Sequence, residues 1–184
     1  MRMTSTVAAG FLMTLPIACS SAGSAPSSGA VKPTAGAVAV TPPASVPANL
    51  NVPAGHALVL KALARGVQVY VCTPTGWTLK APDAELFDEK GNKIGHHSAG
   101  PTWELADGSA VVGEMKEKAP ADGTIPWLLL ARKSVRGEGT LSRVTFIQRL
   151  ETQGGKPPAD GNCAGAPPEA RIDYSATYYF YAAR

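Results

Sequence analysis

A two-residue hydrophobic period recurs through residues 46–184, and it constrains the fold more than any other feature of this chain. In Gly66–Cys72 the valines alternate with other residues, so the two sets of side chains lie on opposite faces of an extended strand. Leu141–Leu150 alternates in the same way, and Ile172–Phe180 is rich in the aromatic residues that strands favour. These segments predict a domain built from β-strands.

Turn-forming sequences separate the predicted strands, among them Glu89–Asn92, Asp107-Gly108 and Gly137–Gly139. The other strand candidates are His56–Ala62, Trp77–Leu79, Ala84–Asp88, Lys93–His97, Thr102–Leu105, Ser109–Glu117 and Trp127–Lys133. Many short strands at this spacing favour an all-β fold, either a β-sandwich or a barrel-like domain. The length of this region suits a single domain.

The first 18 residues have the pattern of an export signal. Arg2 supplies a positive charge, and Val7–Leu15 is an apolar run too short to span a bilayer. Ala18 is the small residue expected before a cleavage site, and Cys19 follows it. We therefore predict a signal peptide at 1–18 and a lipoprotein in which Cys19 is lipidated.

The lipoprotein pattern usually has Leu three residues before the lipidated cysteine. Here Pro16 stands at that position and Leu15 comes one residue earlier. The alternative is an ordinary secretory signal in which Cys19 has no role. Both interpretations predict an exported protein, either anchored in the bacterial cell envelope or secreted.

Residues 19–45 contain Ala, Pro, Ser and Gly in abundance, with Lys32 as the single charge and no aromatic residue. Such a segment cannot bury enough apolar surface to offset its ordering entropy. We predict a flexible linker with a root-mean-square span of roughly 25–30 Å. The β-rich domain then occupies residues 46–184.

Two cysteines remain once Cys19 is set aside, namely Cys72 and Cys163. An even number in an exported domain predicts a disulfide bond. The alternative is a pair of buried free thiols. Neither residue has a Cys or His partner at the spacing of a zinc site.

The formal net charge of +3 is spread thinly along the chain. Arg2 and Lys32 are the only charged residues before Val46, which leaves the β-rich domain close to neutral. The sequence contains no dense Lys/Arg patch, so we expect no nucleic-acid partner.

The segment Gly95–Ser109 holds the densest group of polar residues. His96 and His97 are adjacent in a predicted strand, so they must point to opposite faces and only one can join a given site. Trp103 is either a stacking platform for a sugar or another ring, or an aromatic residue of the core. With Gln68, a polar residue in the middle of a strand, the candidate ligand-binding residues are Gln68, His97, Trp103, Glu104 and Asp107.

Gln68 also belongs to a second group of polar residues in predicted strands, with Tyr70, Gln148 and Arg149. A polar side chain that faces a core must find hydrogen-bond partners. These residues could therefore line a pocket, form a buried polar network or face solvent.

No motif in the chain assigns a catalytic residue, a metal ligand or a cofactor. Ser109 follows a turn, Asp107-Gly108, and does not lie in the Gly-x-Ser-x-Gly pattern of a nucleophile elbow. His-x-His and His-Glu-x-x-His spacings are absent. The competing hypothesis is a small hydrolase or metal-dependent enzyme that uses His97, Glu104 and Asp107.

Several long segments of the domain together resemble one protein family. They are Gly66–Cys72, Pro82–Asp88, Gly95–Glu104, Asp107–Ser109, Ile125–Leu129, Ile147–Arg149, Thr152–Gly155 and Tyr174–Phe180. The chain from about Val46 onward is similar to the exported bacterial and fungal proteins classed as domain of unknown function DUF3455. The resemblance implies export and no established activity.

The sequence as a whole favours a lipid-anchored β-domain of the cell envelope that acts as a binding module. Its expected partners are the membrane, through the lipid on Cys19, and a small molecule or glycan.

Overall fold

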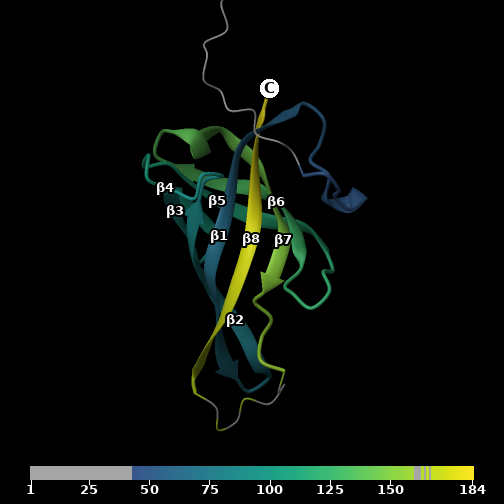
Figure 1. The fold of residues 1–184 in the computed structure, drawn as a ribbon, viewed down its shortest axis with the longest axis vertical. Coiled ribbons are helices and arrows are strands. Elements are labelled where there is room, and N and C mark those ends of the chain that lie inside the picture. Colours follow the sequence, from purple (N-terminus) through teal and green to yellow (C-terminus); the bar gives the residue numbers. More distant parts are fainter. Residues whose placement is uncertain (1–42, 160–162, 164, 166) are drawn as a thin grey trace, which may run out of the picture. The chain divides into compact units, whose positions relative to one another are not determined.

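The computed structural model describes residues 43–159, 163, 165 and 167–184. It shows eight antiparallel strands in one closed barrel, in which each strand pairs with the next and β8 pairs with β1 (Figure 1). The strands are β1 (His56–Thr73), β2 (Gly76–Phe87), β3 (Lys93–Ser98), β4 (Thr102–Leu105), β5 (Ala110–Ala119), β6 (Trp127–Arg136), β7 (Val144–Gly154) and β8 (Glu169–Ala183). The all-β prediction is confirmed, and of the two predicted architectures the chain forms the barrel.

Two short 3₁₀ turns, η1 (Ala48–Leu50) and η2 (Thr140–Arg143), are the only helical elements within the described ranges. None of the helical segments described is long and apolar enough to cross a bilayer. The predicted signal peptide at 1–18, Cys19 and the linker up to residue 42 lie outside the described residues.

Strand β1 is a single long strand that joins two of the predicted ones. Its Gly66 marks a close approach to β2 and does not end the strand. A Cβ atom at Gly66 would lie 2.2 Å from the carbonyl oxygen of Asp83, so a larger residue would push the two strands apart. Strand β2 likewise joins two predicted strands and carries Pro82 in its middle.

Alternate residues of each strand fill the barrel interior, as expected for a small barrel. In β8 the inward side chains are Tyr174, Ala176, Tyr178 and Phe180, all buried in the main core. Tyr179, between them, belongs to a second cluster on the outer surface.

That outer cluster is covered by the segment that precedes β1. Leu50 of η1 is fully buried, and its carbonyl oxygen accepts a hydrogen bond of 2.7 Å from Nε2 of Gln148 in β7. The hydroxyl of Tyr181 donates to Oε1 of the same Gln148 at 2.9 Å. The outward-facing Gln148 is thus satisfied by a strap of chain that lies against the barrel wall.

One end of the barrel, which we call the plugged end, is closed by η2. Leu141 of η2 is fully buried in the main core. The Oδ2 atom of Asp107, in the turn before β5, accepts a bond of 2.8 Å from the Thr140 amide. The Ser109 hydroxyl in the same turn donates to Asp107 at 2.5 Å and accepts from the Leu141 amide at 3.1 Å. These bonds fasten the plug to the β4–β5 turn.

The predicted disulfide between Cys72 and Cys163 is confirmed, with 5.7 Å between the two Cα atoms. It joins the end of β1 to the loop between β7 and β8, and it closes a loop of 91 residues. In the chain-entropy model a loop of this size contributes about 4–5 kcal/mol to stability.

Candidate functional site

The end of the barrel opposite the plug holds a cavity of about 390 Å³. That volume lies within the usual range of small-molecule sites. We call this the open end, and Figure 1 shows β1, β2 and β8 running on past it as a long ribbon. Most of the wall is apolar, and comes from Leu79, Ala81, Pro82, Pro101, Met115, Pro126, Leu128 and Leu130. Its polar lining residues are Gln68, Lys80, His97, Trp103, Lys118, Arg149 and Tyr178.

His97 and Trp103 form the aromatic wall of the cavity. They are paired residues on β3 and β4, and their rings stack with centroids 4.4 Å apart and planes 8° apart. Gly113 on the neighbouring β5 leaves the room that the indole needs, because a Cβ there would lie 3.0 Å from Cζ3 of Trp103. The pair is almost completely buried.

His97 is neutral in the folded protein. Burial lowers its pKa to about 3; the bond to Thr102 opposes this fall, while the positive charge of Arg149 adds to it. Because the carbonyl oxygen of Thr102 can only accept, Nδ1 of His97 carries the proton and donates across 2.8 Å. Nε2 is therefore left as a hydrogen-bond acceptor.

Three buried donors that line the cavity have no hydrogen-bond partner among the described residues. They are Nε2 of Gln68, Nε1 of Trp103 and the hydroxyl of Tyr178. Leaving such a group unsatisfied costs about 1–3 kcal/mol, so native structures contain few of them. Water or another molecule in the cavity would have to supply the missing acceptors.

Arg149 brings a positive charge into this apolar region. It lies on β7 opposite Tyr178 of β8, and its Nε and Nη2 atoms donate to the carbonyl oxygen of Pro126 at 3.1 and 2.8 Å. Burial raises the pKa of Tyr178, and the charge of Arg149 opposes that rise. The Tyr178 hydroxyl consequently stays protonated at neutral pH and remains a donor.

The structure brings three of the five predicted binding residues, Gln68, His97 and Trp103, to the same cavity. Glu104 and Asp107 lie elsewhere. Glu104 follows the inward-facing Trp103, so strand alternation turns it outward, where it is exposed and pairs with Arg136.

Asp107 lies at the plugged end, where it accepts a hydrogen bond from η2. Hydrogen bonds from Ser109 and from the Thr140 amide lower the pKa of its carboxyl to about 2. The Ser109 hydroxyl is fully buried and already bonded to Asp107 and Leu141, which leaves it no role as a nucleophile.

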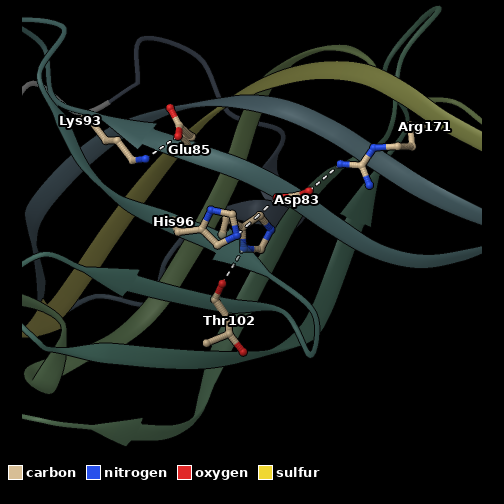
Figure 2. A network of polar contacts seen from close by, with 7 residues as sticks. Asp83, Glu85, Lys93, His96, Thr102 and Arg171 are labelled. Carbon is tan, nitrogen blue, oxygen red and sulfur yellow. Dashed lines mark hydrogen bonds and ion pairs between the residues drawn. The ribbon is translucent and has the colours of Figure 1, made fainter.

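The expected separation of His96 from His97 is confirmed. His96 is exposed on the outer surface, with Nε2 3.5 Å from Oδ1 of Asp83. Figure 2 shows Asp83 between His96 and Arg171, whose Nη2 lies 2.6 Å from Oδ2 of Asp83. Exposed pairs of this kind contribute little to stability. Within the described part of the chain, no three His, Cys, Asp or Glu side chains form a group that could hold a metal ion.

The second group of polar residues is divided by the structure. Gln68 and Arg149 line the cavity, whereas Gln148 lies on the outer face under η1. Tyr70 donates a bond of 2.6 Å to the carbonyl oxygen of Gly155 in the β7–β8 loop. Tyr178 was not among the predicted binding residues. The alternation of Tyr174, Ala176 and Tyr178 along β8 is the sequence feature that indicates its inward direction.

These features define a small antiparallel β-barrel with one plugged end and one open end that holds a cavity. The chain belongs to the family described as protein of unknown function (DUF3455), which matches residues 53–182. No curated protein matches this chain, and no solved structure does.

Proposed function

We propose that this protein is a binding module that takes a small molecule with an apolar body into the open end of its barrel. The observation that carries the proposal is the cluster of three unpartnered donors on Gln68, Trp103 and Tyr178 around one apolar cavity. A ligand with acceptor atoms would satisfy those donors while its apolar part covers the wall.

The positions of the other polar residues support binding over catalysis. The enzyme hypothesis needs His97, Glu104 and Asp107 near one reacting atom. His97 lies in the interior, Glu104 on the outer surface and Asp107 at the plugged end. Each of the last two already has a structural partner.

We further propose that the module is held at the bacterial cell envelope by a lipid on Cys19, with residues 20–45 as a tether. The export signal in the sequence supports this location, and a disulfide suits an oxidising compartment. Replacing the anchor, Cys19→Ser, should move the protein from the membrane fraction to the soluble exported fraction. Unchanged membrane fractionation of this variant would show that Cys19 is not the anchor.

A neutral fluorescent probe tests the cavity. N-phenyl-1-naphthylamine brightens when it leaves water for an apolar pocket, so its fluorescence should rise and saturate as the purified protein is added. Leu128→Trp places a larger side chain in the cavity wall and should abolish the rise.

Val135→Trp is the matched control, because Val135 lies on the same strand, β6, but outside the cavity and 42% exposed. It should bind the probe as the unmodified protein does. Absence of binding to the unmodified protein, or equal binding by Leu128→Trp, would contradict a binding function at this cavity.

A further inference from the structure

We infer that the ligand of this cavity is an amphipathic monocarboxylic acid, whose carboxylate is held by Arg149 and the Tyr178 hydroxyl and whose apolar body covers the wall. This inference rests on the binding function proposed above and names the chemical class that the site selects.

The charge of the cavity lining favours an anionic ligand. The cavity is lined by three cations, Lys80, Lys118 and Arg149, and by no Asp or Glu. Lys80 is exposed and pairs with Glu169, and Lys118 is exposed to solvent. Arg149 is half-buried and enters no ion pair with the residues that the structure describes. A cation withdrawn from water without a counter-charge is unfavourable, so the site favours a negatively charged ligand.

The hydrogen-bond donors of Arg149 and Tyr178 suit a carboxylate. The two bonds to the carbonyl oxygen of Pro126 fix the Arg149 guanidinium through Nε and Nη2. Its Nη1 atom takes no part in the two bonds to Pro126. Tyr178 is the cross-strand partner of Arg149, and its hydroxyl also lacks an acceptor. A carboxylate has two acceptor oxygens and forms its strongest hydrogen bonds with donors of this kind.

The positive charge available in the cavity favours a carboxylate over a phosphate. Arg149 is the one cation of the cavity lining that is not exposed, and the other donors, Gln68, Trp103 and Tyr178, are neutral. One negative charge balances this set. A phosphate monoester carries close to two negative charges at neutral pH, which exceeds the charge of the one cation that is withdrawn from solvent.

The apolar body has a defined place. Leu128 and Leu130 line the cavity beside Arg149. Leu79 and Met115, which are 49% and 54% exposed, belong to the same lining and form an apolar rim. Exposed large apolar side chains beside a pocket indicate a surface that a ligand covers. A carboxylate at Arg149 would leave its chain on the leucines and against this rim.

Isothermal titration calorimetry with matched ligands tests the inference. Octanoate and octanamide share one apolar chain, and octyl phosphate adds a second charge. The unmodified protein should bind octanoate about tenfold more tightly than octanamide, as expected for a charge-assisted head group. Octyl phosphate should bind more weakly than octanoate.

Arg149→Met should abolish the preference, so that octanoate and octanamide bind with similar affinity. Arg132→Met, at an exposed arginine of β6 outside the cavity, is the matched control and should keep the preference. If Arg149→Met does not fold, Arg149→Lys and Tyr178→Phe replace it, and each should reduce the ratio of the two affinities.

The outcomes separate this inference from the binding function. Equal affinities for octanoate and octanamide in the unmodified protein would overturn the acid as ligand, and so would binding of the neutral probe alone. Tighter binding of octyl phosphate would overturn the single charge. A retained preference for octanoate in Arg149→Met would overturn the role of Arg149. Failure of every ligand, including the neutral probe, would overturn the binding function itself.

Discussion

The two ends of the barrel treat buried polar groups in opposite ways. At the plugged end, Asp107, Ser109 and the amides of Thr140 and Leu141 satisfy one another. At the open end, Gln68, Trp103 and Tyr178 line a cavity, and their buried donors receive no acceptor from the described chain. Both ends are built from the same strands, so the difference comes from the side chains and turns.

This contrast distinguishes polar groups that stabilise the fold from those that the proposed binding function would use. A buried polar group that has its partners stabilises the fold, whereas one without partners costs free energy. The sequence marks both Asp107 and His97 as candidate site residues. Only the structure shows that Asp107 fastens a turn, whereas His97 lines the cavity at the open end.

The two ends should differ most in the stability that is lost when an apolar side chain is shortened. Leu141→Ala removes a fully buried side chain from the plug and should lower the free energy of unfolding by about 2–5 kcal/mol. Leu79→Ala, at the half-exposed rim of the open end, should change it by less than about 0.5 kcal/mol. Urea unfolding followed by circular dichroism measures both values.

The same two variants should behave in the reverse order towards ligands. Folded Leu141→Ala should bind the neutral probe as before, whereas Leu79→Ala should bind it more weakly because Leu79 lines the cavity. If both variants lost equal stability, the plug would not be the better packed end and the comparison would break.

The next effect is the dependence of the protein's stability on pH. The unfolded chain takes up a proton on His97 near pH 6.5, whereas the folded barrel resists it until about pH 3 because of burial. The stability contributed by neutral His97 is present above pH 6.5 and is lost as the pH falls towards 3. Between pH 6.5 and 4.5 this loss is about 2–3 kcal/mol.

His97→Phe should remove that part of the acid dependence while keeping a flat ring against Trp103. The exposed neighbour provides the control, since His96→Phe should keep the pH profile of the unmodified protein. Chemical unfolding at a series of pH values gives the profiles. An unchanged slope in His97→Phe would mean that His97 is not held neutral by the open end.

The strands could be predicted from local pattern, but their closure into a barrel could not. Alternation and turns indicate most of the strand segments, because each depends on a few neighbouring residues. The pairing that closes the barrel joins β1 to β8, from opposite ends of the domain, and no local pattern specifies it. The sequence therefore favours a β-sandwich and a β-barrel equally.

The candidate site shows the same limit. Strand alternation makes Trp103 and Glu104 face opposite sides, so the two could not share a site. Arg149 was harder to place, because a register shift between Val144 and Phe146 changes the phase of β7. After that bulge, Ile147 and Arg149 face the interior and Gln148 faces out. A bulge is set by pairing with neighbouring strands, and the sequence of β7 alone does not reveal it.

The smallest effect on stability is expected when one hydroxyl is removed at each end. It tests the contrast most directly, because only the deletion at the plugged end should lower the free energy of unfolding. Ser109→Ala at the plugged end leaves the Leu141 amide without its acceptor and removes one of the hydrogen bonds to Asp107, and should cost about 1–2 kcal/mol of stability. Tyr178→Phe at the open end removes a hydroxyl that has no acceptor. It should leave stability unchanged or raise it by up to about 1 kcal/mol.

Thermal unfolding of the two variants without ligand, and again with octanoate, completes the test. Octanoate should stabilise the unmodified protein and Ser109→Ala equally, and should stabilise Tyr178→Phe less, because that variant has lost a donor to the carboxylate. A large loss of stability in ligand-free Tyr178→Phe would mean that its hydroxyl already has a structural partner. The donors of the open end would then resemble those of the plugged end, and the distinction between the two ends would no longer identify a binding site.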